Sequence, residues 1–243
     1  DSFRQTLGAF SNFARDATYP YGSGGPNSIF AFITDNYMRT YGARREDFGR
    51  IAVAQRTNAL ANPNALFKKP LTLDEYMAAR PISDPIHLFD CVMPCAGAEA
   101  FLVMSEDKAR ELGLPYAVIR GAIERHNAFA EDPVMVQGGW RMDRGDLYAQ
   151  AGVQPKDIDF IQTYDDYPVI VMMQFEDLGF CEKGEGPEFV RSHGMTYAGS
   201  FPNNTSGGQL SVGQAGAAGG FLGMTEAIRQ LTGQAGQRAV KDA

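Results

Sequence analysis

The sequence NNTSGGQLSVGQAGAAGG occupies residues 203–220, and six of its eighteen residues are glycine. Glycine adopts positive φ and permits close backbone approach, which a chain needs where it wraps a ligand or another element. The apolar residues that follow recur at helical spacing: Phe221, Leu222, Met224, Ile228 and Leu231. This glycine loop therefore predicts an active-site loop that presents its residues at a helix N-terminus.

Outward from the glycine loop, strand and helix patterns alternate through the second part of the chain. Short apolar runs predict strands at residues 98–104, 116–123, 159–164 and 196–201. Helices are predicted at residues 105–112, 146–151 and 168–178, each followed directly by a glycine. Alternation of this kind favours a layered α/β domain.

The first part of the chain predicts helices. Pro26 suits a first helical turn, and Gly42 marks the end of that helix. A second helix is predicted over residues 46–60, with five inward residues: Phe48, Ile51, Ala52, Gln55 and Ala59. Thr72 and Glu75 form a capping box for a third, short helix. Residues 1–25 show no period, which is typical of a loop packed on another element.

Composition excludes several classes of function. A net charge of −7 without a basic cluster predicts no affinity for nucleic acid. No apolar run is long enough to insert into a membrane. Three cysteines without framework spacing predict a reducing, cytoplasmic location, and Cys91 and Cys95 have no matching second pair that would predict a metal site.

Two phenols and two carboxylates stand together in the sequence TYDDYP, residues 163–168, after a predicted strand and before a predicted helix. Ligands of α/β sheets gather at such strand ends, so these side chains could transfer protons or hold a carbonyl oxygen. The alternative is structural, because Asp165 or Asp166 can cap the helix while the tyrosines pack. Cys181, in a charged glycine loop, is interpreted as a buried thiol with no adjacent base.

Five segments in register resemble the thiolase superfamily, and within it the sterol-carrier-protein-x-type thiolases and their bacterial lipid-transfer-protein relatives. The segments are YGARRED (41–47), DCV with AGAEA (90–100), TYDDY (163–167), FEDLGFC (175–181) and NNTSGG (203–208). The resemblance covers nearly the whole chain.

The resemblance implies a thiolase-like layered αβαβα fold, here partial, and a homodimer that acts on acyl-CoA. Coenzyme A would enter as part of the substrate, with no separate cofactor. Residues 1–95 would supply the end of the N-terminal half and a loop region, and residues 96–243 an incomplete C-terminal α/β domain. The chain is accordingly expected to begin after the family's nucleophilic cysteine and to end before its last strands.

Two positions depart from the thiolase pattern. Tyr164 stands where these thiolases have the histidine of their H-D-x-F motif, and Gln214 stands where thiolases have the histidine of G-H-P. Glutamine does not titrate, so Gln214 cannot serve as a general base. Tyr164 is similar to a tyrosine of the superfamily's steroid side-chain aldolases, which work with a small zinc-ribbon and OB-fold partner. That branch usually carries a second tyrosine at the position of Gln214.

The resemblance therefore leaves three functions open: a thiolase-like acyltransferase, a retro-aldolase on steroid or lipid side-chain acyl-CoA, and a non-catalytic lipid or acyl-CoA binding subunit. For catalysis we predict Tyr164 as the acid/base or oxyanion group and Gln214 as a hydrogen-bond donor to the thioester or carbonyl oxygen. The residues predicted to bind substrate are Asp165, Tyr167, Asn204, Gly207, Gly208 and Gly213.

Overall fold

The computed structural model describes residues 19–23 and 25–241, and its centre is helix α7, Pro168–Asp177. Every residue of α7 is buried, as expected of a helix that is apolar almost all round. Pro168 occupies the first turn, where a missing N–H leaves no intrahelical bond unmade. Gly179 follows the helix in the left-handed region, with φ of 86°. The helix predicted over 168–178 is confirmed.

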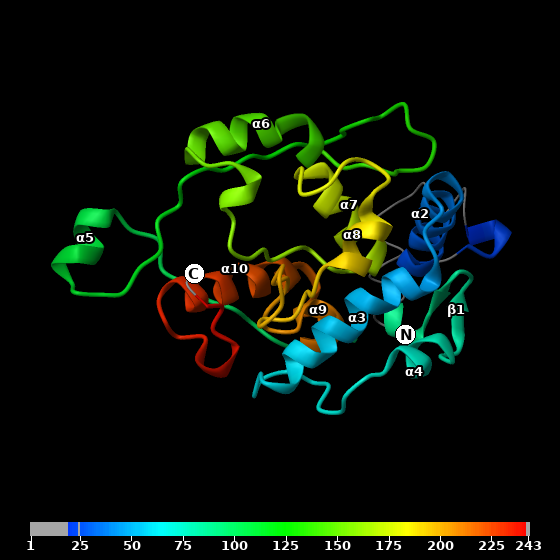
Figure 1. The fold of residues 1–243 in the computed structure, drawn as a ribbon, viewed down its shortest axis with the longest axis horizontal. Coiled ribbons are helices and arrows are strands. Elements are labelled where there is room, and N and C mark those ends of the chain that lie inside the picture. The colour runs from blue at the N-terminus through cyan, green and yellow to red at the C-terminus, as the bar shows by residue number, and fades with distance from the viewer. Residues whose placement is uncertain (1–18, 24, 242–243) are drawn as a thin grey trace.

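Of the helices that pack against α7, three form most of the core with it: α2 (Pro26–Tyr41), α3 (Arg45–Leu60) and α8 (Gly186–Ser192) (Figure 1). The five residues predicted to face inward on α3 are all buried: Phe48, Ile51, Ala52, Gln55 and Ala59. On α2, Ile33 and Tyr37 are buried as the helical period predicts, whereas Ile29 is 50% exposed. Gly42 ends α2 in the left-handed conformation.

The remaining elements are short or lie toward the edges of the molecule. The α-helices among them are α4 (Leu73–Met77), α5 (Glu106–Glu111), α6 (Trp140–Ala151), α9 (Gly208–Val212) and α10 (Gly219–Leu231). The 3-10 turns are η2 (Tyr19–Tyr21), η3 (Leu88–Asp90), η4 (Pro155–Asp157), η5 (Gly216–Ala218) and η6 (Gly236–Arg238). Both halves of the predicted capping box of α4 are present. Within the described residues no helix is long and apolar enough to cross a membrane.

The strand predictions for residues 98–104, 116–123 and 196–201 are wrong. In the part of the chain that the structure describes, the only strands are β1 (Pro81–Ser83) and β2 (Ile86–His87), which pair antiparallel. The run predicted at 159–164 retains one parallel bridge, between Ile161 and Asn203. A strand requires a hydrogen-bonded partner, and apolar composition alone does not supply one.

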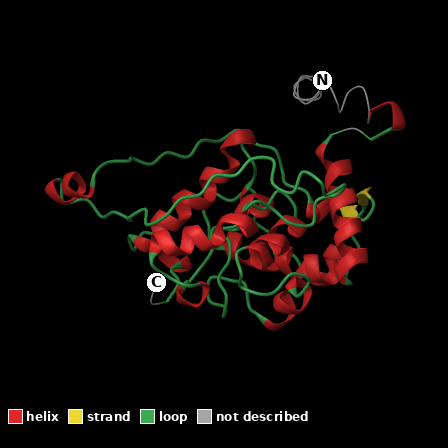
Figure 2. Ribbon diagram, turned by 90° about the horizontal axis from the view of Figure 1, so that it is seen from above, coloured by secondary structure: helices red, strands yellow, loops and turns green. Residues whose placement is uncertain are grey.

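The segment around helix α5 shows most clearly that an apolar run without a strand partner can remain exposed. Figures 1 and 2 show this helix at the tip of a long excursion of the chain, away from the body of the molecule. Ser105 caps it and Gly113 follows it, as predicted. Large apolar side chains on both flanks are exposed: Leu102, Val103, Val118 and Ile119. Helix α6 also differs from its prediction, since it begins at Trp140, directly after Gly138 and Gly139.

Two asparagines near the end of α3 hold the glycine loop in place. The side-chain amide of Asn58 donates to the carbonyls of Asn203 and Asn204 at 3.0 and 3.1 Å. The amide of Asn62 donates to the carbonyl of Ser206 at 3.0 Å. Residues 203–211 of the loop are buried, so their backbone groups need protein partners. These hydrogen bonds fix the glycine loop to the C-terminal end of helix α3 and to the residues that follow it.

Candidate active site

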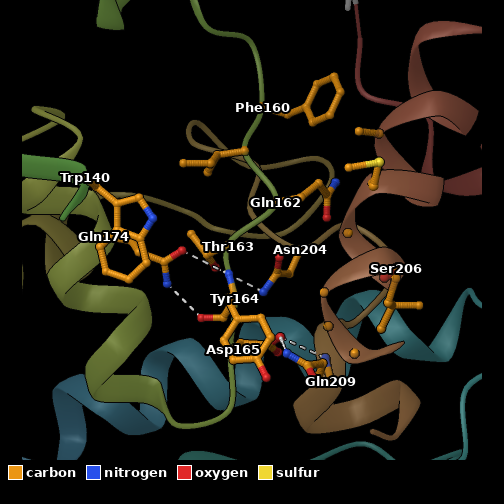
Figure 3. Close-up of a pocket in the computed structure, with 18 residues that line it drawn as sticks. Trp140, Phe160, Gln162, Thr163, Tyr164, Asp165, Gln174, Asn204, Ser206 and Gln209 are labelled. Atoms are coloured by element: carbon orange, nitrogen blue, oxygen red, sulfur yellow. Dashed lines mark hydrogen bonds between the residues drawn. The ribbon is translucent and has the colours of Figure 1, made fainter. Parts of the chain in front are cut away.

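A cavity of about 490 Å³ lies where the TYDDYP segment, the glycine loop and α10 meet (Figure 3). Its lining includes Trp140, Gln162, Tyr164, Gln174, Asn204 and Gln209. The backbone here is ordered by the parallel bridge, in which the N–H of Ile161 donates to Pro202 and that of Asn204 donates to Ile161, each at 3.0 Å. The structure thus brings the predicted strand end and the glycine loop to one cavity.

Asp165 binds the first turn of α9. Its carboxylate accepts hydrogen bonds from the backbone N–H groups of Gln209 and Leu210 at 3.0 and 3.2 Å, and from the side-chain amide of Gln209 at 3.3 Å. The side chain is 1% exposed. Burial raises its pKa to about 6, although these hydrogen bonds act in the opposite direction. Asp165 therefore positions the glycine loop, and it caps α9 rather than α7.

Tyr164, Asp166 and Gln214 lie together beside the cavity. The side-chain amide of Gln214 donates to Oδ1 of Asp166, and the Tyr164 phenol interacts electrostatically with the same carboxylate. Burial, followed by the charge of Asp166, raises the pKa of Tyr164 to about 12. Burial also raises the pKa of Asp166, against the effect of Tyr164. Two of these residues were the predicted catalytic pair.

The backbone of Gln214 is anchored on a neighbouring segment. Its N–H donates to the carbonyl of Met93 and its carbonyl accepts from the N–H of Cys95, both at 2.9 Å. Gly213, with φ of 119°, brings the chain against Cys95 and Leu66, where a Cβ atom would lie within 2.9 Å of both side chains. Gly213 lines an adjacent cavity of about 230 Å³ rather than the cavity at Tyr164.

The other predicted glycine-loop residues have unusual backbone conformations. Asn204, Gly207 and Gly208 have φ of 46°, 109° and 60°. A Cβ atom at Gly207 would lie 2.5 Å from that of Ala59, and one at Gly208 would lie 2.1 Å from the carboxylate of Asp165. Asn204 and Gly208 line the cavity. These positions require small or flexible residues because α3 and Asp165 approach the loop closely.

Tyr167 lies apart from the other predicted residues. It is buried against α2, where its ring stacks on Phe30 at 4.1 Å and its hydroxyl donates to Asn27 at 2.6 Å. Burial raises its pKa well above the ordinary value. Its place is in the core, as the packing alternative for this segment expected, and its role in substrate binding stays a prediction.

Several residues that line the cavity were not predicted from the sequence. Gln174 and Gln209 come from helices, and Trp140 precedes the predicted start of its helix. One signal was available: Gln174 is a lone amide in the apolar run 168–175, and a buried amide needs partners. The thiols of Cys91 and Cys181 are half-buried, and burial raises the pKa of each to about 12. Neither environment activates a nucleophile.

Comparison with known proteins agrees with this geometry. Residues 121–243 match the family model described as "Thiolase C-terminal domain-like". The chain is 37% identical over 225 residues to a steroid side-chain-cleaving aldolase of Thermomonospora curvata, a match that covers 88% of this chain and 56% of that protein. It is 34% identical over 227 residues to a 17-hydroxy-3-oxo-4-pregnene-20-carboxyl-CoA lyase of Mycobacterium tuberculosis, a match that covers 89% and 57%.

A solved structure, "Ltp2-ChsH2(DUF35) aldolase", superposes on the chain with a TM-score of 0.78 at 30% identity. The match covers 92% of this chain and 61% of that one. The chain thus spans a little over half the length of these relatives. The predicted thiolase-like, mixed α/β fold is confirmed, and the chain belongs to the thiolase superfamily.

Proposed function

We propose that this chain belongs to an enzyme that cleaves a carbon–carbon bond of a β-hydroxyacyl-CoA by a retro-aldol reaction. The names of the two relatives support this reaction class, since one is a side-chain-cleaving aldolase and the other a CoA lyase. The substrate would be a steroid or lipid side chain carried as its CoA thioester. The products would be a ketone or aldehyde and a shorter acyl-CoA.

The observation that carries the proposal is the chemistry of the Tyr164–Asp166–Gln214 group. Thiolase-type acyl transfer needs a base near a cysteine thiol, and Gln214 does not titrate. Its amide is instead turned toward Asp166. A retro-aldol reaction needs only a group that removes a hydroxyl proton and a site that stabilises an enolate. A half-exposed phenol beside a carboxylate suits the first of these needs.

The cavity also suits a ligand with polar groups. Oε1 of Gln162 and Oε1 of Gln209 are buried and have no hydrogen-bond partner among the described residues. Both glutamines line the cavity beside Tyr164. Buried acceptors without a donor are rare in folded proteins, so they favour a bound hydroxyl or an ordered water at this place. Trp140 and Leu222 provide apolar lining for the remainder of the ligand.

We further propose that the enzyme is a cytoplasmic homodimer with a small zinc-ribbon and OB-fold partner. The solved aldolase is named as an assembly of two components, Ltp2 and ChsH2(DUF35), which supports a partner of this kind. Helix α10 exposes three large apolar side chains, Phe221, Met224 and Leu231. Exposed apolar groups on one helix are typical of a surface that another protein covers.

The test uses the full-length native protein with its partner and a tertiary β-hydroxyacyl-CoA. We expect a ketone and a shorter acyl-CoA as products, and a loss of at least about 100-fold in kcat for Tyr164→Phe. Tyr116→Phe, on the exposed excursion around α5, is the matched control and should keep full activity. Unchanged turnover in Tyr164→Phe would refute the role of Tyr164. CoA-dependent acyl exchange would instead indicate a thiolase, and tight binding without turnover a binding subunit.

A further inference from the structure

We infer that Gln162 and Gln209 are specificity-determining residues, which select an acyl-CoA that carries hydroxyl groups besides the one that reacts. This inference rests on the proposed retro-aldol function and deepens it by naming the substrate class. It starts from two buried amide oxygens in the cavity lining that have no donor among the described residues. The contacts behind each amide show why these oxygens, and not the amide nitrogens, are left without a partner.

The amide of Gln162 is oriented by a buried chain of hydrogen bonds that begins at Glu226. Arg238 donates to both carboxylate oxygens of Glu226, at 3.1 and 2.9 Å, so this ionised carboxylate only accepts. The Thr205 hydroxyl therefore gives its one proton to Glu226, at 3.0 Å. Its oxygen accepts from Nε2 of Gln162 and from Nε2 of Gln230, each at 2.9 Å. The nitrogen of the Gln162 amide thus faces Thr205, and its Oε1 is the atom left without a donor.

The amide of Gln209 is oriented in the same way by Asp165. Its Nε2 donates to Oδ1 of this carboxylate at 3.3 Å, which directs Oε1 away from Asp165. Oε1 lies against Gly219 of α10, where a Cβ atom would be only 1.9 Å from it. Gln209 is 2% exposed, so bulk water does not solvate this oxygen. An acceptor buried in this way normally has a donor, and the ligand is the natural source of one.

Three glycines of α10 leave room for a ligand opposite these amides. Gly219, Gly220 and Gly223 all line the cavity. A Cβ atom at Gly220 would lie 3.8 Å from the Tyr164 ring, and one at Gly223 would lie 3.1 Å from Cβ of Gln162. Gly219 and Gly223 are four residues apart, about 6 Å along the helix. The two glutamines therefore border α10 about one turn apart, with the Tyr164 ring close to both, so one acyl chain can contact all three side chains.

One reacting hydroxyl cannot satisfy both amide oxygens. A hydroxyl carries a single proton, and retro-aldol cleavage needs that proton to face the group that removes it, which we propose to be Tyr164. A hydroxyl bound by an amide oxygen would direct its proton away from the phenol. The oxygens of Gln162 and Gln209 therefore need other donors. A hydroxyl on a carbon near the reacting one supplies such a donor and leaves the reaction unchanged.

The cavity lining favours a neutral donor over a cationic one. Asp165 is the only charged side chain among the described residues that line the cavity, and both of its oxygens already accept from the backbone of α9. No free carboxylate is left to balance an ammonium group. A hydroxyl is a neutral donor that an acyl chain can carry close to the reacting carbon. The substrate class is therefore a polyhydroxylated acyl chain, carried as its CoA thioester.

The first test compares two substrates in the full-length protein with its partner. One is a β,γ-dihydroxyacyl-CoA, and the other is the β-hydroxyacyl-CoA that lacks only the γ-hydroxyl. We expect kcat/KM to be about 100-fold or more higher for the dihydroxy compound, because buried acceptors stay unpaired when the second hydroxyl is missing. Equal values would overturn the inference, since water or the thioester arm common to both substrates would then serve the two oxygens. Cleavage of both compounds would leave the proposed function intact.

The second test asks whether the two glutamines cause the preference. Gln209→Met and Gln162→Met remove the acceptor at nearly constant volume, and each should lower the preference for the dihydroxy substrate by about 10-fold or more. The matched control is Gln230→Met, which removes the other amide donor to Thr205 from a buried position outside the cavity lining. It should lower stability and leave the ratio of the two kcat/KM values unchanged. An unchanged ratio in both cavity variants would overturn the assigned roles.

Binding measurements separate a failure of this inference from a failure of the proposed function. If neither compound is cleaved, the proposed function is wrong, and calorimetric titration of both compounds into the wild type then decides the selection of hydroxyl donors. Binding of the dihydroxy compound that is tighter by about 10-fold or more would support it, and equal affinity would overturn it. The comparison of the two compounds on the wild type also decides the question if a variant does not fold.

Discussion

The carboxamide of Gln174 holds the backbone of Tyr164 from both sides. Its Oε1 accepts from the Tyr164 N–H at 3.0 Å, and its Nε2 donates to the Tyr164 carbonyl at 2.7 Å (Figure 3). The same Nε2 donates to the carbonyl of Ile170 within α7 at 3.0 Å. The central helix therefore fixes the peptide groups on both sides of the Tyr164 side chain.

This relationship predicts that Gln174→Met lowers kcat by about 10- to 100-fold, since a misplacement near 1 Å can have an effect of that size. Methionine preserves the volume but leaves two backbone groups of Tyr164 without partners, so the free energy of unfolding should fall by about 1–3 kcal/mol. Kinetics and denaturant unfolding measure the two effects. Gln237→Met, at an exposed position, is the control. Wild-type kcat in a folded Gln174→Met protein would contradict the positioning role.

Adjacent glycines at the start of α10 should respond in opposite ways to alanine. At Gly219 a Cβ atom would lie 1.9 Å from Oε1 of the buried Gln209, so Gly219→Ala should lower the free energy of unfolding by about 1–3 kcal/mol. At Gly220 it would lie 3.8 Å from the Tyr164 ring, an ordinary contact. Gly220→Ala should be neutral or stabilising by up to about 1 kcal/mol, because alanine favours the helix. Equal effects in urea unfolding would disprove the packing at Gly219.

Asn58 should be among the least replaceable residues of α3. Besides holding Asn203 and Asn204, its Oδ1 accepts from the backbone N–H of Tyr197 at 2.9 Å, and the side chain is fully buried. Asn58→Ala leaves the carbonyl of Asn203 and the N–H of Tyr197 without a partner, whereas the carbonyl of Asn204 still accepts from the N–H of Gly207. We therefore expect a loss of about 2 kcal/mol or more in the free energy of unfolding. The neighbouring Thr57→Ala removes only a bond to Val53 in the same helix. A loss no larger than that of Thr57→Ala would show that the loop does not depend on Asn58.

The pKa of Asp165 predicts how stability depends on pH. Burial raises this pKa to about 6 in the folded state, above the roughly 3.9 of an unfolded chain. The associated stabilisation is fully present below about pH 4 and is lost as the pH rises through 6. Relative to Asp165→Asn, the free energy of unfolding of the wild type should therefore fall by about 2 kcal/mol between pH 4 and 7. Urea unfolding at both pH values measures this difference, and a constant difference would mean that Asp165 titrates normally.

Local patterns predicted the helical parts of this protein well. The ends of α2 and α7 at Gly42 and Gly179, and the capping box of α4, depend on residues a few positions apart. The strands could not be predicted in the same way. Leu102 and Ile119 lie in apolar runs that read as buried strands, yet both are exposed. Burial and pairing depend on neighbours distant in sequence, which a short apolar run does not specify.

The same distinction between local patterns and distant contacts applies to the candidate site. The motifs alone indicated the thiolase superfamily and the absence of a titratable group at position 214, whereas the tertiary structure brought the TYDDYP segment and the glycine loop to one cavity. Only the tertiary structure distinguished the two adjacent aspartates, since Asp165 binds α9 while Asp166 accepts a hydrogen bond from Gln214. The partners Gln209 and Gln214 lie 44 and 48 positions away in sequence. Which side chain faces which partner is therefore decided by how α3, α7 and α9 pack, because local spacing sets a residue's element but not its distant contacts.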